Sequence, residues 1–340
     1  MTDIVTTEHR DDILVIRVDN PPVNALGHAV RDGVTAALAD TGDARAVVLH
    51  CAGRTFFAGA DITEFGKPPK TPSLPDMIAA LEDCPVPVIA AIHGMALGGG
   101  LETALGCDYR LIDRKARVGF PEIDLGIFPG AGGTQRAPRL SGIPATLAMT
   151  LDGKPVGAGR AVEMGLCDEI SDGDILENAI AFAKTKSGKR RVKDMDVPES
   201  GQAAIDAELA KAHKSRRGQI AVDKAAEAVL AAASLPFEAG LDRERELFLE
   251  LIGGSQSRAM RHLFFAERLS AKVDGLNAQP RQLGLDGGGV LKGIAGSLVS
   301  YASATTAVVV LMAFAPFRMT VLALDRPTAK WFAATGPFVG

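Results

Sequence analysis

One stretch of the sequence decides the fold: Ile92-His-Gly-Met-Ala-Leu-Gly-Gly-Gly-Leu-Glu102, which runs from a predicted strand into a predicted helix. Three successive glycines, Gly98-Gly99-Gly100, stand where the helix begins, and they leave the backbone N–H groups unshielded. Donors aligned with the helix dipole suit a developing oxyanion. Glu102 falls in the first turns of this helix, as a candidate acid or base. Acidic residues also favour helix starts for capping alone, so this stretch leaves both interpretations open.

A second stretch, Thr55-Phe-Phe-Ala-Gly-Ala-Asp-Ile62, is a turn of small residues that follows a predicted strand. Small side chains let backbone N–H groups point into a cleft, because nothing bulky covers them. An ordinary tight turn has the same composition. Taken alone, the segment favours that simpler interpretation.

A third stretch contains Val118-Gly-Phe-Pro-Glu122 and is followed by Gly126-Ile-Phe-Pro-Gly-Ala-Gly-Gly-Thr-Gln-Arg136. Glu122 lies among the apolar residues Phe120, Ile123 and Ile127. Apolar surroundings raise the pKa of a carboxyl group and suit it to donate a proton near neutral pH. The alternative is a glutamate on an exposed loop.

Outward from these stretches, apolar strands alternate with segments of helical spacing. We expect strands at 13–18, 46–49 and 86–92, and helices at 29–40 and 76–82. This alternation predicts an α/β fold built from parallel βαβ units. From Glu199 to about Lys272 the chain is rich in Ala, Glu, Lys, Leu and Arg, which predicts helices with breaks at Gly218, Pro236 and Gly253-Gly254.

Composition narrows the class of protein. Apolar residues are 47% and charged residues 23% of the 340, which is typical of a globular protein. The balance of 37 basic and 41 acidic residues offers no basic field, so we expect no nucleic-acid partner. Four widely spaced cysteines form no CxxC pair and no metal pattern. They predict buried side chains in a reducing compartment, and they are Cys51, Cys84, Cys107 and Cys167.

The ends of the chain carry no targeting signal that we identify. Residues 1–10 are polar, unlike a secretory signal, and Pro337-Phe-Val-Gly340 is not a peroxisomal address. We therefore expect a cytoplasmic protein.

In their order and spacing, the three stretches resemble the crotonase, or enoyl-CoA hydratase, superfamily. The resemblance extends from Asn20-Pro-Pro-Val-Asn-Ala-Leu26 to Ala161-Val-Glu-Met-Gly-Leu166. The helical continuation resembles the hydratase portion and linker of the multifunctional fatty-acid oxidation enzyme, in the segments Pro198-Glu-Ser-Gly-Gln202, Leu235-Pro-Phe-Glu238 and His262-Leu-Phe-Phe-Ala-Glu-Arg268. It implies a crotonase-type spiral of βαβ units with an appended C-terminal helical region. We expect a hydratase core at 1–188, a helical linker packing on the core at 189–275 and an uncertain tail at 276–340.

The resemblance also implies a reaction and the residues that carry it. The N–H groups of Ala60 and Gly99 would form an oxyanion hole, while Glu102 and Glu122 would direct one water to C3 of a trans-2-enoyl-CoA. The reaction would be reversible hydration to 3-hydroxyacyl-CoA in fatty-acid β-oxidation. The implied substrate-binding residues are Ala58, Asp61, Ile62, Gly98 and Phe120, with Ala58 to Ile62 lining the coenzyme A adenine pocket.

Two rival functions remain open at this stage. An enoyl-CoA isomerase needs a single acid/base, which Glu122 alone would supply. A non-catalytic acyl-CoA-binding or membrane-tethered subunit is the other rival, although the presence of both glutamates argues against it. The partners implied by the resemblance are an acyl-CoA substrate and either a second copy of the chain or a thiolase subunit. We expect no metal.

The tail departs from the multifunctional enzyme. Leu285-Asp-Gly-Gly-Gly-Val-Leu-Lys-Gly-Ile-Ala295 approaches the dinucleotide fingerprint, but Lys292 occupies the third glycine position and Asp286 interrupts the strand. Because only 45 residues follow Ala295, we expect no NAD and no other redox cofactor. One hypothesis is that the tail is a truncated or frame-disturbed remnant of the dehydrogenase. No charged residue lies between Lys292 and Arg318, a length that would span a bilayer. A buried segment explains this equally well, and we expect no membrane partner.

Overall fold

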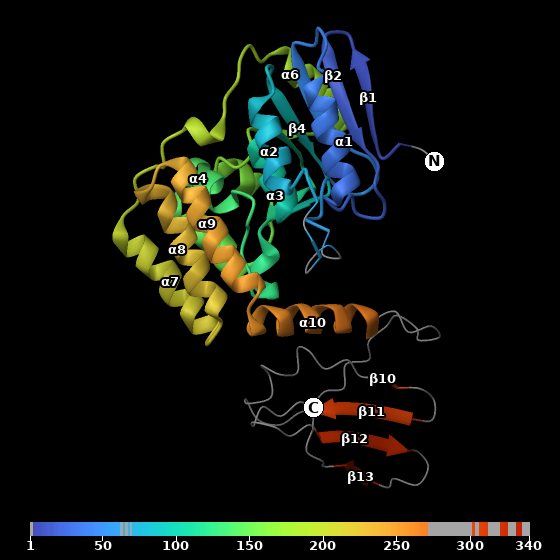
Figure 1. Ribbon diagram of the computed structural model, residues 1–340, viewed down its shortest axis with the longest axis vertical. Helices are drawn as coiled ribbons and strands as arrows, with labels where there is room; N and C mark the ends of the chain where they lie inside the picture. The colour runs from blue at the N-terminus through green and yellow to red at the C-terminus, as the bar shows by residue number, and fades with distance from the viewer. Residues whose placement is uncertain are drawn as a thin grey trace. The chain divides into compact units, whose positions relative to one another are not determined.

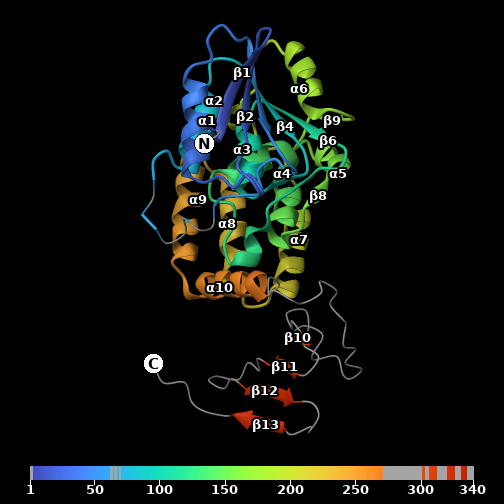
Figure 2. The same cartoon turned by 90° about the vertical axis from the view of Figure 1, so that its right-hand side faces the viewer.

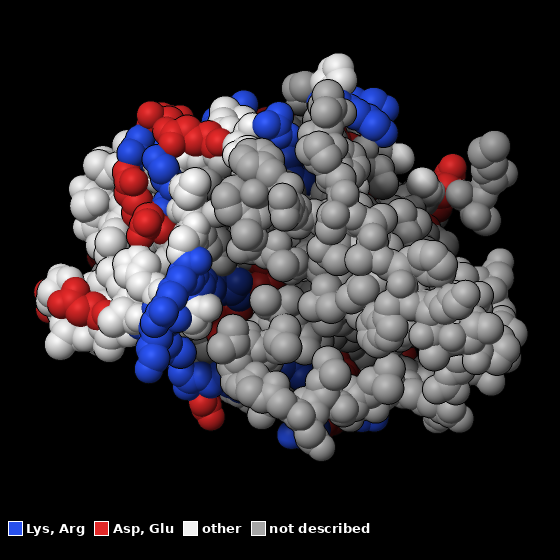
Figure 3. All heavy atoms as spheres, turned by 90° about the horizontal axis from the view of Figure 1, so that it is seen from below, with Lys and Arg blue, Asp and Glu red and all other residues white. Residues whose placement is uncertain are grey.

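The computed structural model describes residues 3–61, 64, 67–68, 70–270, 301–302, 306–311, 320–325 and 331–334, with side chains up to 266. Two compact units divide the chain, Met1–Met260 and Arg261–Gly340. On the face drawn in Figure 3, basic and acidic side chains occur next to one another.

A sheet of six strands forms the centre of the first unit (Figure 1). Its order is β1 (Val5–Arg10), β2 (Ile13–Val18), β3 (Ala46–Cys51), β4 (Val88–Ile92), β6 (Tyr109–Asp113) and β9 (Glu169–Ser171). Within this sheet, β2, β3, β4, β6 and β9 are paired in parallel, as the alternation of strands and helices predicted, and β1 runs antiparallel to β2. The sequence did not reveal β1, because its residues are mostly polar and it forms the sheet edge.

Helices cover both faces of this sheet. Leu14 and Ile16 face α1 (His28–Ala39), α2 (Leu74–Asp83) and α3 (Gly99–Gly106), whereas Ile13 and Val15 face α6 (Ile175–Lys184). Alternate residues of a strand point to opposite faces, so β2 needs apolar residues at successive positions. Each buried aliphatic side chain of this kind stabilises the fold by about 1.5–3 kcal/mol.

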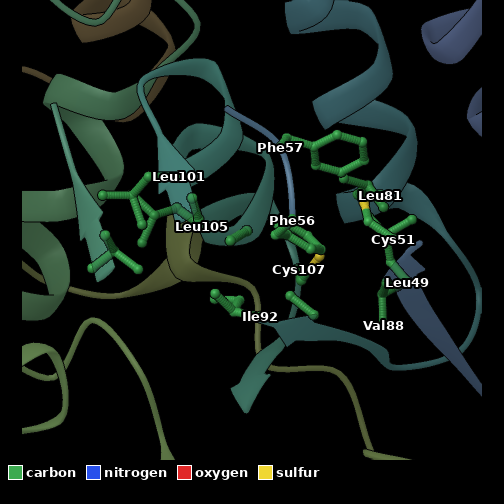
Figure 4. Packing of buried hydrophobic residues seen from close by; sticks show 14 of the residues in the cluster. Leu49, Cys51, Phe56, Phe57, Leu81, Val88, Ile92, Leu101, Leu105 and Cys107 are labelled. Carbon is green, nitrogen blue, oxygen red and sulfur yellow. The ribbon is translucent and has the colours of Figure 1, made fainter. Parts of the chain in front are cut away.

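Figure 4 shows Phe56 and Phe57, from the loop after β3, among the buried hydrophobic residues of the core. Phe56 and Phe57 are fully buried, with their ring centroids 4.6 Å apart in an edge-to-face arrangement. The helix α3 lies so close that a Cβ on Gly100 would stand 2.0 Å from the carbonyl oxygen of Phe57. Glycine is therefore required at this contact, which holds the loop against the start of α3. All four cysteines are buried and free, as the sequence predicted.

A smaller sheet consists of β5 (Met95–Leu97), β7 (Arg117–Gly119) and β8 (Val156–Gly157). Its strand β7 leads into the 3₁₀ helix η2 (Pro121–Leu125), which carries Glu122. The Gly98 N–H donates to the Gly119 carbonyl at 2.9 Å. This bond brings the start of α3 beside the start of η2.

The remaining helices of the first unit pack around α4 (Gly133–Asp152), which is interrupted at Gly142 where φ is 77°. They share a second apolar core with α4 and lie next to one another in Figures 1 and 2. These helices are α7 (Gln202–Ser215), α8 (Ile220–Ser234) and α9 (Phe237–Ile252). Two short elements precede them, α5 (Ala158–Glu163) and the 3₁₀ helix η3 (Val192–Asp194). Helices α7, α8 and α9 end within three residues of the predicted breaks, and α10 (Ser255–Ser270) follows Gly253-Gly254.

The second unit contains an antiparallel sheet of β10 (Tyr301–Ala302), β11 (Thr306–Leu311), β12 (Thr320–Asp325) and β13 (Trp331–Ala334). The near-match to the dinucleotide fingerprint at 285–295 lies outside the described residues. The described parts of the uncharged segment between Lys292 and Arg318 are strands. In the portion of the chain that the structure describes, no helix is both long and apolar enough to cross a membrane.

Candidate active site

Glu102 lies in the first turn of α3 and is 2% exposed. Its Oε1 atom accepts hydrogen bonds from the N–H groups of Ala131 at 2.7 Å and Gly133 at 2.8 Å. Burial raises the pKa of Glu102 to about 7, although the two amide bonds and the Arg136 guanidinium oppose the rise. Donors aimed at one oxygen stabilise the ionised form, so the two amides limit the rise in the pKa of Glu102 and leave it close to neutral pH.

Glu122 extends from η2 toward the same place. A Cβ on Gly98 would lie 2.4 Å from its Oε1 atom, so the carboxyl group packs directly against the Gly98 backbone. Its Oε2 atom is buried and has no hydrogen-bond partner among the described residues. Burial raises the pKa of Glu122 well above its usual value, and the charges of Glu102 and Glu244 add to the rise. The surroundings of Glu122 therefore favour its protonated form.

The backbone N–H groups of Ala60 and Gly99 belong to neighbouring segments close to Gly98, against which Glu122 packs. A Cβ on Gly99 would lie 3.3 Å from the amide nitrogen of Ala60, which places these two residues side by side. Neither N–H group donates a hydrogen bond to another described residue. Gly99 also begins α3, whose N-terminal dipole attracts negative charge. Together they offer two donors to an oxyanion.

Asn24 holds the turn that carries Ala60. It is 3% exposed, has a φ of 51°, and donates from Nδ2 to the carbonyls of Ala52 and Thr55, each at 2.8 Å. Leu26 then forms an isolated parallel bridge with Ala60. The segment 55–60 is thus held in place by residues 24 and 26. The interpretation of this segment as an ordinary tight turn missed that support, because the support comes from residues about 30 positions earlier in the chain.

The other predicted substrate-binding residues fall into three groups. Ala58 and Asp61 are partly exposed beside Ala60, and Gly98 is buried at the start of α3. Phe120 is fully buried in the core cluster. Ile62 lies outside the described residues.

Two charged features of the site were not found from the sequence. Glu244 of α9 is 2% exposed and faces the start of α4. Arg136 forms a buried two-point ion pair with Glu82 of α2, at 2.8 and 2.9 Å. One signal for Glu244 was present: it occupies the buried stripe of α9 that also contains Gly240 and Leu247.

Two surface pockets of about 440 and 410 Å³ lie away from these glutamates, one among α7, α8 and α9 and the other beside β6, β9 and α6. Within the described residues, no group of three or more His, Cys, Asp or Glu side chains is arranged to hold a metal ion.

A family model described as enoyl-CoA hydratase/isomerase matches residues 8–219, the segment that supplies Ala60, Gly99, Glu102 and Glu122. The chain belongs to the enoyl-CoA hydratase/isomerase family. Membership supports an enzyme that acts on a coenzyme A thioester, and the family's name covers both hydration and isomerisation. The fold is the crotonase type that the sequence predicted.

Relatives and solved structures agree with this family. The peroxisomal bifunctional enzyme of Cavia porcellus is 39% identical over 275 residues, which cover 76% of this chain and 38% of the relative. The fatty acid oxidation complex subunit alpha of Vibrio vulnificus (strain CMCP6) is 34% identical over 316 residues, which cover 86% of this chain and 45% of the relative. The structure of a carnitinyl-CoA dehydratase from Mycobacterium avium 104 is 27% identical, with a TM-score of 0.58, covering 78% of this chain and 97% of that one.

The chain spans about two fifths of the length of the curated relatives it matches. The predicted resemblance to the hydratase portion of a multifunctional fatty-acid oxidation enzyme is therefore confirmed. Some relatives are named as peroxisomal, and the expected cytoplasmic location stays a prediction.

Proposed function

We propose that this chain is an enoyl-CoA hydratase, which adds water reversibly to a trans-2-enoyl-CoA and yields a 3-hydroxyacyl-CoA in fatty-acid β-oxidation. One observation carries the proposal: two buried carboxyl groups that interact electrostatically differ in their hydrogen-bond partners. Glu102 accepts two amide hydrogen bonds, whereas the buried Oε2 of Glu122 has no partner among the described residues. Hydration needs both a base and an acid.

In the proposed mechanism, Glu102 takes a proton from water while the water oxygen forms a bond to C3. The π electron pair moves toward the thioester, and negative charge develops on the thioester oxygen. The N–H groups of Ala60 and Gly99 would stabilise this enolate. Such a donor typically contributes about 10²- to 10³-fold in rate.

Glu122 then transfers its proton to C2, which completes the 3-hydroxyacyl product. After this step Glu102 holds a proton and Glu122 is ionised. A proton transferred from Glu102 to Glu122 resets the site, so water is the only net reactant besides the enoyl-CoA. Because hydration transfers no electrons, we propose that the reaction needs no NAD or other redox cofactor.

The test compares hydration of crotonyl-CoA and of a longer enoyl-CoA by wild type, Glu102→Gln and Glu122→Gln. Each glutamine keeps the side-chain length but removes the acid/base function, so we expect kcat to fall by about 10²- to 10⁴-fold. Loss of the conjugated thioester absorbance reports the reaction. Glu163→Gln is the matched control, because Glu163 lies exposed on α5.

A parallel assay with a 3-enoyl-CoA separates hydration from isomerisation. An isomerase would move the double bond in both wild type and Glu102→Gln and lose that activity in Glu122→Gln. If wild type shows this pattern and does not hydrate crotonyl-CoA, the hydratase proposal is wrong. If wild type binds acyl-CoA without any turnover, the chain is a binding subunit.

A further inference from the structure

A third buried carboxyl group supports the proposed site from outside the segment that the family model matches. Glu244 belongs to α9, and the match ends at residue 219. Its Oε1 atom accepts a hydrogen bond from the Gly132 N–H at 2.6 Å. Its Oε2 atom accepts from the Thr134 N–H at 3.1 Å and from the Thr134 hydroxyl at 2.5 Å. Glu244 thus binds the same short segment that binds Glu102.

The backbone from Ala131 to Thr134 divides its four N–H groups between these two glutamates. The N–H groups of Ala131 and Gly133 donate to Glu102, and those of Gly132 and Thr134 donate to Glu244. The first N–H groups of a helix have no partner inside the helix. Each glutamate therefore satisfies donors that the other does not reach, and α4 begins between them.

Close packing of α9 holds Glu244 in this position. Gly240 and Phe248 lie four residues before and after it, on the same face of the helix. A Cβ on Gly240 would stand 2.2 Å from the Gln135 side-chain oxygen, and a Cβ on Gly130 would stand 2.5 Å from the Phe248 ring. At both points α9 packs tightly against the residues that flank the start of α4, which keeps the carboxyl group of Glu244 next to Gly132 and Thr134.

We propose that Glu244 is a positioning residue, which holds the Gly132 and Thr134 amides so that the Ala131 and Gly133 amides orient the carboxylate of Glu102. This inference rests on the proposed hydratase function. The inference also gives α9 a role in the site, because this helix holds the backbone at Ala131–Thr134, which orients Glu102.

Glu244 can bind the start of α4 in either of its protonation states. As a carboxylate it accepts all three hydrogen bonds. When protonated on Oε2, it donates to the Thr134 hydroxyl and still accepts from both amides. A glutamine keeps an oxygen for Gly132, but its NH₂ group is not an acceptor for the Thr134 amide. An alanine loses both amide bonds. The two substitutions therefore form a graded pair.

The experiment measures kcat and KM for Glu244→Gln, Glu244→Ala and the matched control Glu238→Gln, which is exposed on the same helix. Since a misplacement of the base by a fraction of an ångström to 1 Å costs up to about 100-fold, we expect kcat to fall by about 10-fold for glutamine and about 100-fold for alanine. KM should change little, because both carboxyl oxygens of Glu244 accept hydrogen bonds from the start of α4. The conservative variant should thus be partly rescued relative to alanine.

A second measurement does not depend on activity. Amide hydrogen exchange at residue resolution should show faster exchange at Ala131 and Gly133 in both Glu244 variants and no change in Glu238→Gln. These two amides donate to Glu102 and not to Glu244, so a purely local effect would leave them unchanged. Faster exchange in a chain whose wild type does not hydrate would refute the hydratase function and keep the positioning role. Unchanged exchange at both amides, with wild-type kcat in Glu244→Gln, would overturn the inference.

Discussion

Gly98→Ala tests whether the position of the Glu122 carboxyl group controls the reaction. The added methyl group would lie 2.4 Å from Oε1 and 3.0 Å from the carboxyl carbon of Glu122. Ordinary contacts at a Cβ begin near 3.4 Å, so Oε1 must withdraw by about 1 Å. The carboxyl group is the far end of a flexible side chain, and it moves more easily than the backbone of α3. We therefore expect a folded protein with a displaced acid.

The magnitude follows from that displacement. A misplacement of 1 Å in a catalytic group costs about 100-fold in rate, and we expect kcat for crotonyl-CoA to fall by that factor. The backbone contributes separately, because Gly98 has a φ of 53° and a ψ of −125°. A non-glycine residue in such a conformation costs about 1–3 kcal/mol, which chemical denaturation would measure as a lower free energy of unfolding.

A matched control separates the two effects. Gly173→Ala also places a side chain at positive φ, 92°, but its Cβ would meet nothing within 4 Å. It should lower stability to a similar degree and leave kcat unchanged. If Gly98→Ala hydrates crotonyl-CoA at the wild-type rate, the carboxyl group of Glu122 does not act from the position described above, and the assignment of the acid is wrong.

Three further predictions concern ionisation and the supports of the site. Because burial raises the pKa of Glu102 to about 7, kcat/KM should rise with pH as this base ionises. It should fall again at higher pH as Glu122, whose pKa is raised further, loses its proton. A pH–rate profile in which kcat/KM does not rise through the acidic range contradicts the role of Glu102. Glu82→Gln leaves the buried Arg136 guanidinium without its anionic partner and should lower the free energy of unfolding by about 3–5 kcal/mol, measured in urea, and an effect near zero would show that the pair is not buried in solution. Asn24→Ala leaves two carbonyl groups unpaired and should cost about 1–3 kcal/mol for each; thermal unfolding reports this loss, and unchanged stability would refute it.

Local patterns in the sequence were enough for three strands of the central sheet and for the helical region after Glu199. The apolar runs predicted at 13–18, 46–49 and 86–92 contain strands at 13–18, 46–51 and 88–92, with both faces largely buried. The helices α7, α8 and α9 end within three residues of the predicted breaks. The edge strand β1 was missed, since its polar residues show no apolar alternation. Its pairing with β2 depends on a partner, and its own sequence contains no sign of that pairing.

The candidate site divides in the same way. The sequence placed Glu102 at the start of a helix and Glu122 among apolar residues, because both features depend on neighbours within a few positions. Glu244 was not found, since it contacts Gly132 across 112 residues of chain.

The sequence by itself determined the strand–turn–helix units, the buried cysteines and the two candidate carboxyl groups, because hydrophobic periodicity and glycine conformation act over short distances along the chain. The tertiary structure alone decided which amides those carboxyl groups receive. Hydrogen bonds from Ala131 and Gly133 to Glu102, and from Gly132 and Thr134 to Glu244, require α3, α4 and α9 to meet at one point. Burial then raises the pKa of all three carboxyl groups, and the charge of Glu102 adds to the rise at Glu122 and Glu244. Both effects arise only when packing removes water and brings like charges together.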